Sequence, residues 1–466
     1  MVRPPQGRPA VSRISRRRFL ASSLTATAGW SLLSDRAAGQ VAAPPVPSDR
    51  PLRLGVIGIG NRGADMIKTF AATDLVTYTG FCDVHLDAPH TAEARALYPA
   101  VPRFDSFRSM FDAVGDGIDA VAICAPDHAH FPAAMYAMAR GKHVYVEKPL
   151  AQTFHEVDLL MAMAERSGVV TQMGNQGHSG GNYFQFKAWT EAGVIRDVTR
   201  IDAFMNASRR WHGWTVDAYP PGERVPPGLN WEEWLAARPV HPYNAKLHPL
   251  TWRGWFDYGT GALGDWGAHI LDTAHRFLDL GLPRTVEAIR REGTSPLIYP
   301  QASTIRFAFP ARGSMPPVDV FWFDGVGNRP PLPPELGPGA TLSEEAGKFI
   351  YSRQLLFRGG THGDTLRIVP EARMRGMAAA LPRVGGGFSD HATNFVRACH
   401  GREESRSPFR VAGPLTQVLL LGVIAQRLGG RLTFDAARRE FVENRAATDL
   451  LSGPPPRPGW ERFYHL

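Results

Sequence analysis

Cysteine is scarce in this sequence of 466 residues, which contains Cys82, Cys124 and Cys399. Three cysteines, widely spaced and odd in number, provide no disulfide framework, and the chain is too long to be a small scaffold stapled by disulfides. Charged residues make up only 21% and hydrophobic residues 44%, which argues against wholesale disorder and against a multi-span membrane protein. At about 100–200 residues per domain, the length predicts two or three domains.

The body of the chain carries little net charge, although the formal total is +8. Residues 1–50 hold eight arginines, no lysine and two acidic residues, which amounts to +6. The remaining 44 basic and 42 acidic residues give +2. A nearly neutral body offers no electrostatic footprint for nucleic acid, so no nucleic-acid partner is expected.

The beginning of the chain has the outline of an export signal. Three arginines at 16–18 precede two bulky apolar residues, and a short uncharged stretch follows over 21–33. That stretch is shorter than the ~20 apolar residues of a membrane span, and the small residues at 37–39 suit cleavage. We expect residues 1–39 to be a twin-arginine signal peptide, recognised by the export machinery that carries folded proteins; a disordered basic terminus is the alternative. The protein would then be periplasmic, or anchored by its leader at the outer face of the inner membrane.

Short apolar runs rich in β-branched residues alternate with helical patterns over residues 52–172. The expected strands are 52–59, 75–82, 118–124 and 143–146, and the expected helices are 64–70, 132–140 and 153–167. Strands that alternate with helices predict a parallel, doubly wound sheet covered by helices on both faces. The proline-rich residues 40–51 form the predicted linker before it.

The pattern changes after residue 172. Residues 211–266 hold seven of the eleven tryptophans, most of which we expect in the core, although some could stack on sugar rings. Strand-like runs at 286–290, 303–309 and 318–323 are followed by helical patterns at 389–400 and 414–428. We therefore expect an α/β protein whose second domain, residues 173–450, is a mixed α+β unit with an open, largely antiparallel sheet, followed by a tail at 451–466.

Gly58, Gly60 and Gly63 form a G-x-G-x-x-G pattern directly after the first expected strand. In a dinucleotide-binding turn the first glycine makes the turn, the second lets the backbone approach a pyrophosphate, and the third lets helix and strand pack closely. Asp83 closes the next strand, where a carboxylate accepts hydrogen bonds from ribose hydroxyls and repels a 2′-phosphate. The pattern predicts NAD as cofactor, with NADP possible. A plain turn, with Asp83 as a cap, is the alternative.

Lys148 follows the fourth expected strand, in Glu147-Lys148-Pro149, at the sheet edge where ligands of doubly wound folds bind. A lysine there can hydrogen-bond a reacting hydroxyl and stabilise the alkoxide that forms. Asp265 and His269 are four residues apart, which places both on one face of a helix. His269 could accept the proton, with a pKa in the useful range, while Asp265 orients the substrate or the ring. A surface lysine, a helix cap and a core histidine are the alternatives.

These motifs, with Ala125-Pro126-Asp127-His128-Ala129-His130 between them, occur in the order found in the glucose-fructose oxidoreductase and inositol dehydrogenase family (GFO/IDH/MocA). The chain resembles this family, and its exported subgroup with a bacterial-type C-terminal domain, over about residues 52–450. The resemblance implies a Rossmann domain at 52–172 and a C-terminal α/β domain whose sheet often forms a homo-oligomer interface. It implies Lys148 as the catalytic lysine, His269 as the general base and Asp265 in the substrate site. The implied cofactor contacts are Gly58, Gly60, Asn61, Arg62, Gly63, Asp83, Pro126, His130, Glu147 and Lys148.

Substrate contacts are less constrained. Where many members of this family have Arg or Tyr after the sixth strand, this chain has Gly174-Asn175-Gln176-Gly177-His178, so contacts there cannot be transferred. The substrate-site candidates are Gln176, His178, Tyr183 and Asp272, the last as a support for the catalytic residues. Arg209, Arg210, His212 and Lys246 lie among the tryptophans and could reach hydroxyls. The histidines lack a fixed metal-ligand spacing, so no metal site is predicted.

The sequence therefore predicts an NAD-dependent oxidoreductase acting on a secondary hydroxyl of a sugar, sugar derivative or polyol. Free NAD is expected to be scarce outside the cytoplasm, so an exported enzyme should retain its cofactor and reoxidise it with a second substrate. A redox-neutral glycosidase or lyase, acting through a transient keto-sugar, would use the same residues plus an extra acid or base such as Tyr183, His178 or His212. A non-catalytic sugar or nucleotide binder is the third alternative.

Overall fold

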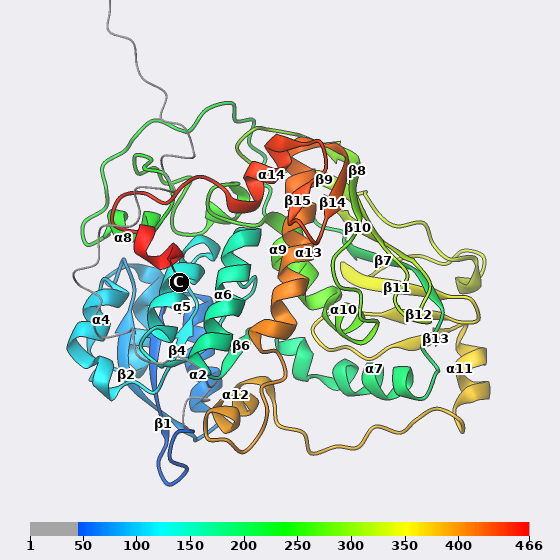
Figure 1. The fold of residues 1–466 in the computed structure, drawn as a ribbon, viewed down its shortest axis with the longest axis horizontal. Coiled ribbons are helices and arrows are strands. Elements are labelled where there is room, and N and C mark those ends of the chain that lie inside the picture. Colours follow the sequence, from blue (N-terminus) through cyan, green and yellow to red (C-terminus); the bar gives the residue numbers. More distant parts are fainter. Residues whose placement is uncertain (1–44, 466) are drawn as a thin grey trace, which may run out of the picture. The chain divides into compact units, whose positions relative to one another are not determined.

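The computed structural model of the chain describes residues 45–465, so the predicted signal peptide at 1–39 and the start of the predicted linker lie outside the described residues. The described part builds two separate sheets (Figure 1). The first is parallel and the second mostly antiparallel, which confirms the predicted α/β fold class. The described end of the linker is fixed to the body, because the Val46 N–H donates to the Cys399 carbonyl at 2.9 Å.

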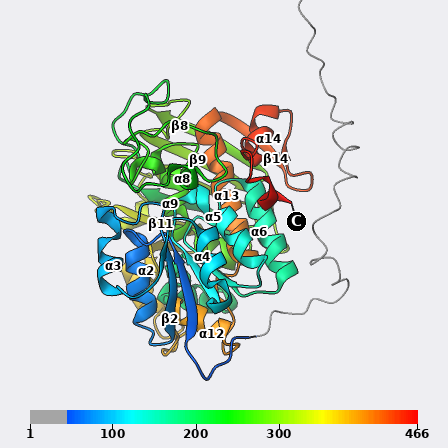
Figure 2. The same ribbon diagram turned by 90° about the vertical axis from the view of Figure 1, so that its left-hand side faces the viewer.

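The first sheet has six parallel strands in the order β3-β2-β1-β4-β5-β6. These strands are β1 (Leu52–Ile57), β2 (Val76–Cys82), β3 (Arg103–Phe104), β4 (Ala120–Ile123), β5 (His143–Val146) and β6 (Thr171–Met173). The helices between them are α2 (Arg62–Ala71), α3 (Ala92–Leu97), α4 (Phe107–Val114), α5 (Asp127–Met138) and α6 (Phe154–Ser167). Figure 2 shows α2 and α3 on one side of the sheet and α4, α5 and α6 on the other. This strand order places the carboxyl ends of β1 and β4 side by side, at the point where dinucleotides bind in such folds.

Local sequence explains these elements. β4 and β5 are buried at every position, as expected for central strands covered on both faces. Thr153 begins α6 with a capping box: its hydroxyl accepts from the Glu156 N–H at 3.2 Å, and the Glu156 carboxylate accepts from the Thr153 N–H at 3.1 Å. Gly168 ends the helix at a φ of 64°, in the left-handed region that glycine adopts without strain.

The second sheet has nine strands in the order β13-β12-β11-β7-β10-β9-β8-β14-β15. They are β7 (Val198–Met205), β8 (Thr285–Glu292), β9 (Ala302–Phe309), β10 (Val318–Asp324), β11 (Ala346–Ser352), β12 (Leu356–Gly359), β13 (Arg367–Val369), β14 (Gly430–Asp435) and β15 (Glu440–Phe441). β7 and β10 pair in parallel, while the other described neighbours are antiparallel. The three strands expected from sequence are β8, β9 and β10. The expectation did not include β7, which lies inside the sheet between β11 and β10.

Helices of the second half cover this sheet and join it to the first. They are α7 (Gly181–Glu191), α8 (Trp231–Leu235), α9 (Gly261–Ile270), α10 (Asp272–Phe277), α11 (Glu371–Met377), α12 (His391–Cys399), α13 (Phe409–Leu428) and α14 (Arg445–Ser452). α13 is long and apolar enough to cross a membrane, but 72% of its most apolar window is buried within the fold. It packs against α6, α9 and β8, so its apolar character is explained by its place in the core between the two sheets (Figure 1).

Two segments of the second half return to the first sheet. The end of the chain places Trp460 and Phe463 against Phe107 of α4 and Tyr136 of α5. The segment around α8 crosses the carboxyl edge of the first sheet, where the Asn230 N–H donates to the Val84 carbonyl at 2.8 Å. This crossing brings residues from both halves to one cleft.

Candidate functional site

The turn between β1 and α2 requires glycine. Gly58 adopts a φ of 81°, and a Cβ there would lie 2.7 Å from the Ala125 backbone nitrogen. A Cβ on Gly63 would overlap the Gly58 carbonyl oxygen. The turn also holds Asn61 at a φ of 45° and a ψ of −106°, directly before α2. The glycines therefore let the N-terminus of α2 approach β1 and β4 closely.

A cleft of about 900 Å³, part of it open to solvent, lies at this turn. The first half of the chain lines it with Gly58, Gly60, Asn61, Arg62, Asp83 and Pro126. The second half lines it with Glu233, Trp234, His248, Trp252 and Arg253. In dinucleotide-binding folds, the pyrophosphate binds at a glycine turn and the N-terminus of the following helix. The ribose binds to a carboxylate at the end of the next strand. The residues present therefore fit NAD.

Asp83 is buried at the end of β2. Its carboxylate accepts hydrogen bonds from the backbone N–H groups of Ile59 at 3.1 Å and His85 at 3.0 Å. Burial alone would raise the pKa of Asp83, but the hydrogen bonds from His90, His85 and Ile59 hold it below its ordinary value. The carboxylate is therefore anionic, as a ribose-binding aspartate should be.

Glu147, at the end of β5, joins the cleft to the residues after β6. Its Oε1 accepts from Arg62 Nε and from Gln176 Nε2, each at 3.0 Å. Gly174 makes room for this group, since a Cβ there would lie 2.8 Å from the carboxylate. Gln176, a predicted substrate contact, thus has its amide engaged in holding Glu147.

Lys148 and Asp265 meet at the centre of the site. Lys148 Nζ donates to Asp265 Oδ1 and, at 3.2 Å, to the Asp265 backbone carbonyl. Arg210 Nε donates to the second carboxylate oxygen at 2.7 Å. Burial would raise the pKa of Asp265, but the charges of Lys148, Arg210 and Arg253 hold it well below its ordinary value. Asp265 thus orients two cations, and it makes no hydrogen bond to the His269 ring.

His269 is four residues further along α9 and is 5% exposed. Its Nδ1 has no hydrogen-bond partner among the described residues. Burial, the charge of Lys148 and that of His362 lower the pKa of His269 well below its ordinary value. The pKa is therefore lower than the sequence-based expectation, because burial in this cluster penalises the charged ring. The ring is neutral and can accept a proton.

Three predicted site residues lie beside this centre. His178 Nδ1 is 3.5 Å from Asp272 Oδ2, and both side chains are buried. Asp272 Oδ1 accepts from the Thr273 N–H at 2.7 Å, at the start of α10. The Tyr183 ring packs against His178, with centroids 4.8 Å apart, and is also in contact with Phe277. The structure thus brings His178, Asp272 and Tyr183 into one group.

His130 has a different place from the other predicted cofactor contacts. Its Nδ1 lies 2.8 Å from the Pro149 carbonyl oxygen and its Nε2 lies 2.8 Å from the Ala125 carbonyl oxygen. The ring therefore joins the turn after β4 to the turn after β5. Pro126, in the first of these turns, lines the cleft directly.

Two residues of the site were missed by sequence analysis. His362 comes from the loop after β12, and its ring stacks on that of His269. Arg253 comes from the tryptophan-rich segment and lines the cleft. The sequence around His362 carries no motif, whereas Arg253 lies between Trp252 and Trp255 in the segment where other cations were considered.

Two family models match the chain. Residues 52–175 match the GFO/IDH/MocA oxidoreductase family, NAD-binding Rossmann fold. Residues 195–289 match the C-terminal α/β domain of the same oxidoreductase family. The matches include the glycine turn, Lys148 and His269, which lie together in the structure.

Curated relatives are similar over part of their length. A glycosyl hydrolase family 109 protein of Saccharopolyspora erythraea is 33% identical over 172 residues, which are 33% of this chain and 37% of the relative. A protein of the same name from a Shewanella species is 29% identical over 224 residues, 44% of this chain and 48% of the relative. The match to these relatives spans less than half of their length.

Solved structures share the fold. The WlbA dehydrogenase of Chromobacterium violaceum, in complex with NADH and UDP-GlcNAcA, superposes with a TM-score of 0.57 at 15% identity, covering 85% of this chain and 99% of that one. The aldose-aldose oxidoreductase of Caulobacter crescentus gives a TM-score of 0.53 at 14% identity, covering 83% and 100%. Both family models, the fold and the assembled motifs agree. Residues 52–175 and 195–289 are therefore the NAD-binding Rossmann domain and the C-terminal α/β domain of the GFO/IDH/MocA oxidoreductase family.

Proposed function

We propose that this protein is an NAD-dependent dehydrogenase that oxidises a secondary hydroxyl of a sugar, sugar derivative or polyol and retains its cofactor tightly. The observation that carries the proposal is the meeting of Lys148 with Asp265 beside the neutral His269, at the carboxyl edge of the NAD-binding sheet. The solved relatives named as sugar enzymes support the substrate class only at the level of the fold.

Three side chains have different roles in the proposed reaction. His269 takes the proton from the substrate hydroxyl, because a neutral imidazole has one ring nitrogen that can accept a proton in either tautomer. Lys148 donates a hydrogen bond to the same oxygen and stabilises its negative charge as the carbonyl forms. Asp265 keeps the Lys148 amine in place. When bound, NAD supplies the acceptor for the hydride.

The segment over the cleft supports retention of the cofactor. His128 on α5 lies 2.6 Å, through Nε2, from the Trp234 carbonyl oxygen of this segment. The Ser106 hydroxyl donates to Glu233 at 3.1 Å, and Arg108 forms an ion pair with the same carboxylate. Since Trp234 and Glu233 line the cleft, these bonds must break before the segment can move away from it.

We also propose export by the twin-arginine route to the periplasm or the outer face of the inner membrane, on the strength of the sequence at 16–39. A retained cofactor suits such an enzyme, since it would reoxidise the cofactor with a second substrate rather than draw on free NAD. Association of subunits through the second sheet is a further part of the proposal.

The similarity to the family 109 relatives favours a second candidate, a redox-neutral glycosidase that acts through a transient keto-sugar. Oxidation of a ring hydroxyl would acidify the neighbouring C–H and permit elimination of the glycosidic group. Addition of water to the unsaturated sugar and return of the hydride to the ketone would then complete a redox-neutral hydrolysis. His178 and Tyr183 lie near Asp272 and are candidates for the extra acid or base. This function predicts release of the aglycone without net formation of NADH.

The first experiment is to purify the chain, denature it and identify any released nucleotide by mass and absorbance. Stoichiometric NAD or NADH is expected. Sugars are then supplied in pairs, as donor and acceptor, and glycosides are tested for release of the aglycone. A protein that is purified empty and binds neither NAD nor NADP when they are added would contradict both candidate functions.

A further inference from the structure

Arg253 differs from the other cations of the site because its guanidinium has no hydrogen-bond acceptor among the described residues. The residue is half-buried and lines the cleft. Its side chain makes no hydrogen bond or ion pair with any residue that the structure describes. Arg62, Arg210 and Lys148, in contrast, each pair with a carboxylate. A half-buried guanidinium without an acceptor has lost hydration and gained no hydrogen bond in exchange, which favours an anion from outside the chain.

The position of Arg253 is fixed by its surroundings. Its Cζ lies 4.2 Å from the ring centroid of the buried Trp252. Its backbone is packed so closely that a Cβ on Gly259 would lie 2.6 Å from the Arg253 Cα. The neighbouring Gly254 lies against the backbone of Arg210, where a Cβ would be 2.7 Å from the Arg210 carbonyl oxygen. The guanidinium is thus held in the site before any ligand binds, which reduces the entropy cost of binding.

The charges around Arg253 place it at the reacting end of the cleft. Its guanidinium is attracted electrostatically by the carboxylates of Asp265, Asp127 and Glu147. The positive charge of Arg210 repels it. Lys148 and Arg210 already share the carboxylate of Asp265. Burial raises the pKa of Asp127, which accepts a hydrogen bond from the Thr260 hydroxyl at 2.7 Å. This end of the site therefore holds three cations, of which Lys148 and Arg210 share one carboxylate while Arg253 has no ion pair of its own.

We propose that Arg253 binds a carboxylate of the substrate, and that the substrate of the proposed dehydrogenase is consequently a sugar acid. A guanidinium matches a carboxylate with two parallel hydrogen bonds, which makes this recognition both strong and directional. The pyrophosphate of the cofactor is the other possible source of anionic oxygens. The N-terminus of α2, at the glycine turn, already offers backbone N–H groups for that pyrophosphate. The oxidation of a sugar acid rests on the proposed dehydrogenase function. The binding of its carboxylate by Arg253 does not.

The test measures binding of matched acidic and neutral sugars to the NAD-loaded full chain by calorimetry. The pairs are D-glucuronate with D-glucose and D-galacturonate with D-galactose. At least one acid should bind about 10- to 100-fold more tightly than its neutral partner, the usual range for hydrogen bonds to a charged group. Arg253→Gln should remove most of this preference, and Arg253→Lys should restore part of it, because lysine keeps the charge and loses the planar fork.

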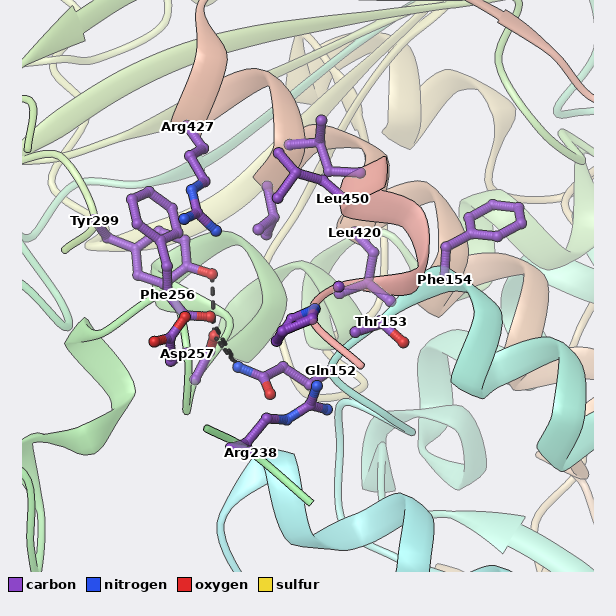
Figure 3. A pocket seen from close by; sticks show the side chains of 15 residues that line it. Gln152, Thr153, Phe154, Arg238, Phe256, Asp257, Tyr299, Leu420, Arg427 and Leu450 are labelled. Atoms are coloured by element: carbon purple, nitrogen blue, oxygen red, sulfur yellow. Dashed lines mark hydrogen bonds between the residues drawn. The ribbon is translucent and has the colours of Figure 1, made fainter. Parts of the chain in front are cut away.

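Arg427 offers a matched control. It lines a second pocket of about 560 Å³, including its open mouth, together with Gln152, Asp257 and Leu450 (Figure 3). Its Cζ lies 5.0 Å from the Phe256 ring centroid, and its side chain has no hydrogen-bond acceptor among the described residues. Arg427→Gln therefore removes a similar half-buried, stacked guanidinium from a different pocket. This variant should keep the preference for the acid.

Three results distinguish a failure of the sugar-acid inference from a failure of the proposed dehydrogenase function. If no acid binds more tightly than its neutral partner, the inference is overturned. If Arg253→Gln weakens NAD binding and leaves the preference for the acid unchanged, the anion is the pyrophosphate and the inference is also overturned. Binding of an acid that depends on Arg253, without any reduction of NAD by it or by its neutral partner, supports the sugar-acid site and contradicts the proposed dehydrogenase instead.

Discussion

The imidazole rings of His269 and His362 stack, with centroids 3.9 Å apart and an angle of 26° between their planes. His269 lies on α9, and His362 takes a left-handed φ of 50° in the loop after β12. This loop is held against α7, where the Asn182 N–H donates to the Gly363 carbonyl at 2.8 Å. The stack covers the proposed base and adds a repelling charge whenever His362 is protonated, so it helps to keep His269 neutral.

Removal of this ring should shift the pH dependence of the reaction. In His362→Ala the burial of His269 and the repulsion on it both decrease, so the pKa of His269 should rise towards its ordinary value. The base is active when neutral, so the acidic limb of kcat/KM should move to higher pH. The measurement is the pH profile with the substrate that reduces bound NAD fastest. His362→Phe keeps the cover and removes only the charge, and it should give a smaller shift. Superimposable acidic limbs in the wild type and His362→Ala would contradict this account.

Asp265→Asn should lower the stability of the protein. The change leaves Lys148 and Arg210 beside each other without their shared carboxylate, and breaking a buried ion pair costs about 3–5 kcal/mol. Thermal unfolding should therefore occur at a lower temperature. The double variant Lys148→Met with Asp265→Asn should be less destabilised than the sum of the two single variants, because the second change removes the uncompensated charge. Additive losses in this double-mutant cycle would show that the two residues do not interact.

Gly174→Ala should weaken cofactor binding. The new methyl group would lie 2.8 Å from the Glu147 carboxylate and must displace it from Arg62 and Gln176. The dissociation constant for NAD should rise, as measured by fluorescence titration of the NAD-free protein. Gly117→Ala is the control, since nothing lies within 4 Å of a Cβ at that position. Equal affinities in the two variants would rule out a role for Glu147 in shaping the cleft.

Stability should fall as the pH decreases from about 7 to about 4. Burial lowers the pKa of five histidines to between about 3 and about 4, and these are His128, His143, His248, His275 and His391. Below the unfolded pKa of about 6.5 the unfolded chain binds protons that the folded chain does not, so acid favours unfolding. Each group contributes up to about 1.4 kcal/mol per pH unit in this window.

The midpoint of thermal unfolding, measured across this pH range, should therefore decrease in acid. His391→Gln should lower the midpoint at neutral pH, because the ring's contacts with Ser179 and Met173 are lost, but it should make the decrease shallower. A midpoint that stays constant down to about pH 4 would mean that these histidines protonate in the folded state.

Much of the first half could be predicted from the sequence. The glycine turn, the alternating strands and helices, and Asp83 at the end of β2 are local patterns whose geometry follows from a few neighbouring residues. The same holds for the helix that carries Asp265 and His269. The central strand β7 was missed, because its pairing with β10 and β11 joins segments far apart in the chain.

The sequence by itself determined which chemical groups are present and in what order: a dinucleotide turn, a lysine at a strand end, and a histidine four residues after an aspartate. Only the tertiary structure decided their partners. It paired Asp265 with Lys148 and Arg210 rather than with His269, engaged Gln176 with Glu147, and brought His362 and Arg253 into the site. The physical reason is that helical spacing and strand ends follow from local backbone geometry, whereas ion pairs and ring stacks depend on side-chain positions set by packing across the whole fold.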